Sequence, residues 1–127
     1  MKDLTECTVL IVDDTETNVD ILVDALGEEY DISVAMDGES ALEIVEDEKP
    51  DLILLDIMMP GMDGFEVCER LKKDDRTINI PVMFLSGKTD TADKERAMSM
   101  GAVDYITKPI NVPEIKEKVL NFFLQKE

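Results

Sequence analysis

Short apolar runs alternate with amphipathic segments along the whole chain. Five runs are rich in β-branched and aliphatic residues, as strands are: Val9–Val12, Ile32–Ala35, Leu52–Leu55, Val82–Leu85 and Asp104–Thr107. The first, third and fourth runs are apolar without alternation. This pattern predicts parallel strands that are buried on both faces of a sheet.

The segments between these runs carry apolar residues at helical spacing. Three stripes are formed by Ile21, Leu22, Ala25 and Leu26, by Ala41, Leu42, Ile44 and Val45, and by Ile115, Val119, Phe122 and Phe123. Asp37-Gly38 marks the start of the second helix, and Pro50 and Gly101 end the second and fourth. Pro60-Gly61 with Asp63-Gly64 marks a loop before the third helix, and Pro113 suits the first turn of the last. Because strands and helices alternate over the full length, we expect an α/β protein with a parallel sheet covered on both sides.

The length fits one compact domain over residues 1–127, and no internal repeat, linker or low-complexity stretch interrupts it. The chain stops a few residues after the fifth helical segment, so we expect no output domain within it. No apolar run approaches the roughly 18 residues of a membrane span, and Met1 to Glu6 lack a signal-peptide pattern. We therefore expect a cytoplasmic location and no membrane partner.

Charge and histidine content narrow the classes of function. The sequence has 13 Lys and Arg against 30 Asp and Glu, and its formal charge of −17 disfavours direct binding of nucleic acid. Histidine is absent, which removes His-based catalysis, most transition-metal sites and a phosphohistidine of the chain's own. Cys7 and Cys68 lack metal-like or redox spacing, and we expect both to be reduced.

Polar residues end four of the predicted strands. The first strand is followed by Asp13-Asp14, the third by Asp56, the fourth by Ser86 and the fifth by Lys108. Ligands of an open parallel sheet bind at the carboxyl ends of its strands, so we expect these side chains at one edge. Each alone has an ordinary alternative as a helix cap, a turn residue, a strand exit or a solvated lysine. Their joint placement favours a functional site.

Carboxylates at such an edge need compensating positive charge. Two unit charges about 4 Å apart repel by ~4 kcal/mol at a surface-like dielectric, and Lys108 supplies part of the compensation. An oxygen-only site with room for waters suits Mg²⁺ better than zinc. A divalent ion beside a carboxylate also neutralises an incoming phosphoryl group. Asp56 is central to the group, so it is the best candidate nucleophile.

With these residues in place, the chain resembles the receiver domain of two-component response regulators over essentially its full length. The resemblance rests on Val12-Asp13-Asp14, on the stretch from Leu55-Asp56 through Met58 and Pro60 to Gly64, on Leu85-Ser86-Gly87 and on Thr107-Lys108-Pro109. It implies a single-domain, flavodoxin-like (βα)5 fold, a doubly wound parallel sheet with strand order 2-1-3-4-5. It also implies a signalling receiver rather than an enzyme, phosphorylated by a sensor histidine kinase or a histidine phosphotransfer protein.

The same resemblance implies the ligands of Mg²⁺ and the phosphoacceptor. Asp56 would accept the phosphoryl group and contact the metal. Asp14 would ligate Mg²⁺ directly, Asp13 would act largely through a bound water, and the backbone carbonyl of Met58 would add a ligand. The side chains at positions 58 and 88, Met and Lys, leave the lifetime of the acyl phosphate open.

Ser86 and Tyr105 would form the switch. Ser86, where many members have Thr, would hydrogen-bond a phosphoryl oxygen, and Lys108 would form an ion pair with it. Tyr105 would turn inward as Ser86 moves; a half-buried strand tyrosine is the plain alternative. The face of the fourth helix, fifth strand and fifth helix would then change, and it is a candidate surface for a homodimer.

The phosphoryl donor is expected to dock on the first helix, where Val19 and Val23 lie outside the core stripe. Three other functions remain as alternatives. A phosphatase of the haloacid dehalogenase type would need a second Asp where Met58 stands. A flavodoxin-like cofactor binder would need a phosphate cradle where Asp13-Asp14 repels phosphate. An inactive receiver used only for docking would not need the intact site.

Overall fold

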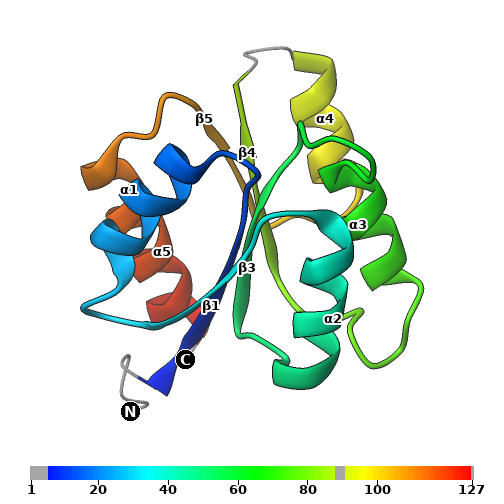
Figure 1. Ribbon diagram of the computed structural model, residues 1–127, viewed down its shortest axis with the longest axis horizontal. Helices are drawn as coiled ribbons and strands as arrows, with labels where there is room; N and C mark the ends of the chain where they lie inside the picture. The colour runs from blue at the N-terminus through cyan, green and yellow to red at the C-terminus, as the bar shows by residue number, and fades with distance from the viewer. Residues whose placement is uncertain (1–5, 88–90, 127) are drawn as a thin grey trace.

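Five parallel strands form one sheet at the centre of the molecule, as Figure 1 shows for the computed structural model. The strands are β1 (Thr8–Val12), β2 (Asp31–Ala35), β3 (Leu52–Asp56), β4 (Val82–Ser86) and β5 (Asp104–Thr107). Their order is β2-β1-β3-β4-β5, and each neighbouring pair is parallel. The predicted strand order and doubly wound α/β fold are confirmed. The structure describes residues 6–87 and 91–126.

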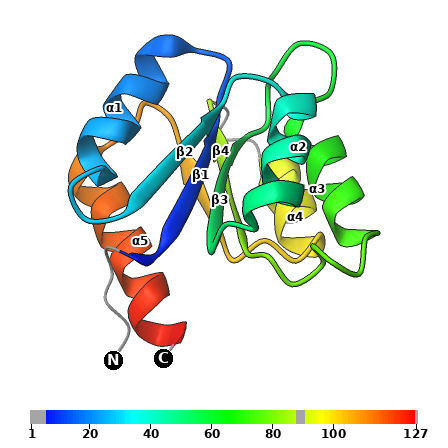
Figure 2. The same cartoon turned by 60° about the horizontal axis from the view of Figure 1, so that its bottom comes forward.

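Two layers of helices cover the sheet (Figures 1 and 2). The helices are α1 (Glu16–Leu26), α2 (Gly38–Glu48), α3 (Gly64–Lys72), α4 (Thr91–Ser99) and α5 (Val112–Lys126). α1 and α5 lie on one face, and α2, α3 and α4 lie on the other. Within the described ranges, none of these helices combines the length and apolar character needed to cross a bilayer.

The predicted boundaries agree with the observed elements to within one residue at each strand end. Two helices begin at the predicted Asp-Gly pairs, because the Asp side chain caps each helix. Asp37 accepts a hydrogen bond from the N–H of Ser40 at 2.8 Å, and Asp63 accepts one from the N–H of Glu66 at 2.9 Å. Gly101 follows α4 with a φ of 89°, a backbone conformation that favours glycine.

Each face of the sheet has its own apolar core. The α1 and α5 side contains Leu22, Leu26, Ile115, Val119 and Phe123 from the predicted stripes, and the α2 to α4 side contains Ala41 and Val45. Cys7 and Cys68 lie in different cores on opposite faces, so they do not pair with each other.

The prediction for Val19 is wrong. Its side chain is 7% exposed and belongs to the core between the sheet and α1. Val23 is half-buried and packs against the same core. The helical stripe on α1 is therefore wider than the sequence pattern indicated, because α5 covers it from the side. Val19 is therefore not available to a partner, whereas docking at the partly exposed Val23 stays a prediction.

Gly64 joins the end of β3 closely to the start of α3. Its N–H donates a hydrogen bond to the carbonyl of Ile57 at 2.9 Å. A Cβ at this position would overlap the carbonyl oxygen of Asp56 and lie 2.9 Å from the Cα of Ile57. The close approach of the two backbones thus requires a residue without a side chain.

Gly64→Ala should therefore lower the free energy of unfolding by about 1–3 kcal/mol, the usual cost of forcing extra atoms into a packed site. Denaturant unfolding measures this change. Gly87→Ala is the matched control, because a Cβ there meets no atom within 4 Å and should change stability little. Equal stability of the two variants would show that the contact at Gly64 is not restrictive.

Candidate functional site

Three carboxylates meet at the carboxyl edge of the sheet. Asp56 is the last residue of β3, and Asp13 and Asp14 follow the last residue of β1. β1 and β3 are adjacent parallel strands, so their carboxyl ends lie side by side. One oxygen of each of the three carboxylates lies within 4.8 Å of the others. The structure therefore brings together the three acidic residues selected from the sequence.

The three carboxylates differ in burial. Asp13 is fully buried and Asp56 is 2% exposed, whereas Asp14 faces solvent. Asp13 Oδ1 accepts a hydrogen bond from the N–H of Thr15 at 2.9 Å. Asp56 Oδ1 accepts one from the N–H of Met58 at 3.3 Å. Two of the acids are thus held by nearby backbone, and Asp14 is the one open to an incoming ion.

Lys108 forms ion pairs with both buried acids. Its Nζ lies 3.0 Å from Asp13 Oδ2 and 3.2 Å from Asp56 Oδ1. Its backbone N–H donates to the carbonyl of Ser86 at 2.6 Å, which ties the end of β5 to the end of β4. The ammonium is therefore fixed between the two buried carboxylates by the strand that carries it.

The crowding changes the ionisation of these groups. Burial and the neighbouring Asp13 carboxylate raise the pKa of Asp56 to about 6, although Lys108 and the Met58 N–H act in the opposite direction. Burial disfavours the charged form of Lys108, but the carboxylates of Asp13 and Asp56 outweigh it and raise the pKa of its ammonium. Lys108 thus stays charged. The ionised form of Asp56 is disfavoured, because the charge of Lys108 does not offset burial and the negative charge of Asp13 together.

This donor set fits a hard cation. All three side chains offer oxygen, and hard divalent ions prefer carboxylate oxygens and water. Asp13 Oδ2 is buried, and among the described residues its contact is the ion pair with the Lys108 ammonium. Within the part of the chain that the structure describes, the Lys108 ammonium pairs with two of the three carboxylates, Asp13 and Asp56. An acidic cluster that can hold a metal ion is therefore present.

Ser86 lies on β4, the strand next to that of Asp56, and Tyr105 lies on β5, one strand further along the sheet. Ser86 is the last residue of β4, fully buried, and pairs in register with Thr107 of β5. Tyr105 is 7% exposed and packs in the core on the α4 side of the sheet, so it is more buried than the half-buried strand tyrosine considered above. The turn of Tyr105 on phosphorylation stays a prediction.

The structure describes one of the two residues whose side chains were expected to affect the lifetime of the acyl phosphate. The Met58 side chain is 56% exposed beside Asp56, while its backbone N–H faces the Asp56 carboxylate. Lys88 lies outside the described residues. Gly64 was expected only as part of a loop, yet it is the first residue of α3 and touches the Asp56 backbone. In the sequence, the feature that could have identified Gly64 is its position directly after Asp63, which caps α3.

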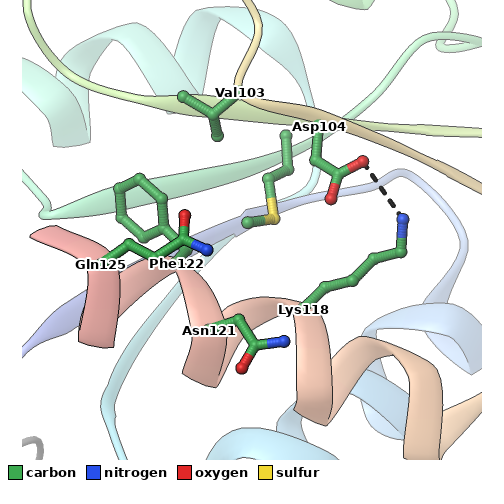
Figure 3. A pocket seen from close by; sticks show the side chains of 7 residues that line it. Val103, Asp104, Lys118, Asn121, Phe122 and Gln125 are labelled. Carbon is green, nitrogen blue, oxygen red and sulfur yellow. Dashed lines mark hydrogen bonds and ion pairs between the residues drawn. The ribbon is translucent and has the colours of Figure 1, made fainter.

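A cavity of 470 Å³ lies away from this edge, between the start of β5 and the second half of α5 (Figure 3). It is lined by Met83, Val103, Asp104, Lys118, Asn121, Phe122 and Gln125. Lys118 Nζ and Asp104 Oδ1 form an ion pair of 3.1 Å across it. None of the three clustered carboxylates lines this cavity, so the chemistry of the carboxyl edge does not extend into it.

Comparison with known proteins agrees with this geometry. Residues 9–120 match the family model of the response regulator receiver domain. A probable cyclic di-GMP phosphodiesterase of Vibrio cholerae is 44% identical over 94% of this chain. The response regulator PleD of Caulobacter vibrioides is 47% identical over 81% of this chain. The chain spans 27% and 23% of the length of these two relatives, about a quarter of each.

A solved structure gives the same result. The receiver domain of the Francisella response regulator 1452 superposes with a TM-score of 0.85 at 31% identity, covering 96% of this chain and 100% of that one. The order of the strands, the acidic cluster at their carboxyl edge and the match over residues 9–120 agree with one another. The chain belongs to the receiver domain family of two-component response regulators.

Proposed function

We propose that this receiver domain accepts a phosphoryl group on Asp56 from a phosphohistidine, in a reaction that depends on Mg²⁺, and then changes conformation to control an output partner or domain. The observation that carries the proposal is the position of the Asp56 carboxylate, buried between Lys108 and two further acids at the sheet edge. Receiver domains of response regulators are phosphorylated by histidine kinases. A sensor kinase or a histidine phosphotransfer protein would be the donor.

The contacts of Asp56 leave one oxygen for the reaction. Met58 N–H and Lys108 Nζ both engage Oδ1, and the described residues form no hydrogen bond or ion pair with Oδ2. Oδ2 would form the new P–O bond as the N–P bond of the donor breaks, and the departing imidazole nitrogen would take up a proton. Little further covalent chemistry is needed, since phosphoryl transfer depends mainly on position and charge.

The remaining site residues would stabilise the transferred group. Bound Mg²⁺ would offset the charge on the phosphoryl oxygens, held by Asp14, Asp56, the Met58 carbonyl and, through water, Asp13. Lys108 already lies 3.2 Å from Asp56, so its ammonium would need little movement to pair with a phosphoryl oxygen.

The alternatives are less well supported. The side chain two residues after Asp56 is a thioether, which cannot act as the acid and base of a phosphatase. Asp13 and Asp14 occupy the turn where a cofactor phosphate would bind in a flavodoxin-like protein, and they would repel it. The cyclic di-GMP chemistry of the Vibrio relative belongs to a protein of which this chain spans 27%.

The response to phosphorylation would reach the face of α4, β5 and α5. Phosphorylated Asp56 carries more negative charge and three acceptor oxygens, so the Ser86 hydroxyl gains an interaction in that state alone. Movement of Ser86 would change the packing of Tyr105, which lies buried on the neighbouring strand. Met98 is 45% exposed on α4 and suits a partner surface that changes, whereas Met100 packs against the core.

This face is also the candidate surface for a homodimer. The strongly acidic chain would act through protein partners in the cytoplasm rather than by binding nucleic acid directly, given its formal charge of −17.

Asp56→Asn should abolish labelling by acetyl phosphate, because an amide oxygen is a poor nucleophile for a phosphoryl group. Intact-mass spectrometry should detect one phosphoryl group on the wild type with Mg²⁺ and almost none with EDTA. Asp14→Asn should label slowly, since one metal ligand is lost. Asp24→Asn removes an exposed carboxylate on α1 and should label as the wild type does. Undiminished labelling of Asp56→Asn would assign the phosphoryl group to another residue.

Ser86→Ala should still accept phosphate but should respond less to it. A hydrogen bond to a charged group contributes about 1.5–3 kcal/mol, so its loss should weaken the shift to the active conformation by roughly tenfold to a hundredfold. Amide NMR of fully phosphorylated protein measures the shifts around Tyr105 and α4. Ser33→Ala, a hydroxyl lost from β2, serves as the control. Full-sized shifts in Ser86→Ala would exclude Ser86 from the coupling.

A further inference from the structure

Helix α4 buries few apolar side chains between Ala92 and Ser99. Its sequence is TADKERAMS, and among Ala92 to Ser99 the side chain of Ala97 alone is buried. A helix with a single small buried side chain gains little free energy from packing. Any additional contact on this helix therefore has a large effect on where it sits.

Arg96 supplies such a contact to α3. Its guanidinium carbon lies 4.1 Å from the centre of the Phe65 ring, a distance typical of a cation–π interaction. Phe65 is 3% exposed, so the guanidinium covers a ring that is otherwise enclosed by the core. α3 and α4 lie side by side in both views of the ribbon (Figures 1 and 2). The stack thus joins the loosely packed α4 to the firmly packed α3.

Phe65 is itself fixed to the phosphoacceptor strand. It follows Gly64, whose backbone packs against Asp56 and bonds to the carbonyl of Ile57. Its ring lies 5.4 Å from the ring of Phe84, which pairs in register with Leu55 of β3 and with Tyr105 of β5. The ring therefore moves with the carboxyl edge of the sheet, and it has little freedom to follow α4.

We propose that the stack of Arg96 on Phe65 is a latch that holds α4 against α3 in the unphosphorylated domain, and that α4 must leave it when Asp56 is phosphorylated. This inference rests on the proposed function. The latch would differ from the route through Tyr105, because it runs through α3 rather than β5, although both begin with the movement of Ser86.

The two sides of the stack are attached to different parts of the domain, and this determines which side moves on phosphorylation. Phe65 is anchored to β3 through Gly64, while α4 is the next element after Ser86 at the end of β4. If Ser86 moves toward a phosphoryl group, the start of α4 is displaced and the Phe65 ring is not. A contact present only in the unphosphorylated state opposes phosphorylation. By linkage, removal of that contact must favour phosphorylation.

The test uses beryllofluoride with Mg²⁺, a tetrahedral mimic of a phosphoryl group on an aspartate, and compares four proteins. Arg96→Ala removes the cation, and Phe65→Leu keeps an apolar side chain but removes the ring face. Lys94→Ala removes the same charge from an exposed position on the same helix, so it controls for charge alone. The wild type completes the set. Thermal unfolding confirms that each variant is folded.

The latch predicts two results. Without ligand, amide hydrogen exchange in α4 should be about twofold to thirtyfold faster in Arg96→Ala and Phe65→Leu, the range expected for the loss of one cation–π contact. The apparent affinity of both variants for beryllofluoride should rise by a similar factor, and their affinity for Mg²⁺ alone should not change. Lys94→Ala should match the wild type in all three measurements.

Four outcomes would overturn the latch. If Arg96→Ala and Lys94→Ala both match the wild type, the stack does not hold α4, and if both differ from it equally, charge alone accounts for the effect. Faster exchange without tighter binding of beryllofluoride would show that the stack holds α4 but is not coupled to Asp56. A wild type that fails to bind beryllofluoride at all would remove the proposed function itself, and the latch with it. Failure of the proposed function is therefore distinguished from failure of the latch, because it is seen in the wild type without any substitution.

Discussion

The shortage of positive charge at the carboxyl edge of the sheet is the constraint on which the rest of the site depends. Asp13, Asp14 and Asp56 lie within 4.8 Å of one another, and Lys108 is the ammonium that pairs with the two buried members. Ionised groups at such distances repel by several kcal/mol at a protein-like dielectric. A divalent cation would relieve this repulsion because it supplies positive charge, whereas a phosphoryl group, which is itself negative, would need such a cation beside it.

The fold keeps the carboxylates together in spite of this repulsion. β3 and β4 are buried along their whole length, and every adjacent pair of strands is parallel, so the strand ends cannot separate without exposing both cores. Gly64 adds a second restraint, since the start of α3 packs directly on the Asp56 backbone. Less firmly packed parts, such as α4, are where a change of charge at Asp56 can be expressed as movement.

Much of the fold and the candidate site could be predicted because both follow local patterns. Five apolar runs, three of them unbroken, identified the parallel strands, and the polar residues after four of these runs identified the edge where the acidic cluster lies. The position of Val19 was mispredicted because α5, which is distant in sequence, widens the buried side of α1. The stack of Arg96 on Phe65 was missed for a similar reason: α3 and α4 meet only through the tertiary fold, and no spacing in the sequence encodes that contact.

The most direct test of the central claim is the titration of the Asp56 carboxyl carbon by ¹³C NMR, with and without Mg²⁺. Burial and the neighbouring carboxylate raise the pKa of Asp56 to about 6, so without metal its signal should change over that pH range. Mg²⁺ favours the ionised carboxylate, so adding it should move the midpoint to lower pH. A midpoint near 3.8 that Mg²⁺ leaves unchanged would mean that Asp56 experiences neither the shortage of charge nor the metal. That result would contradict the account.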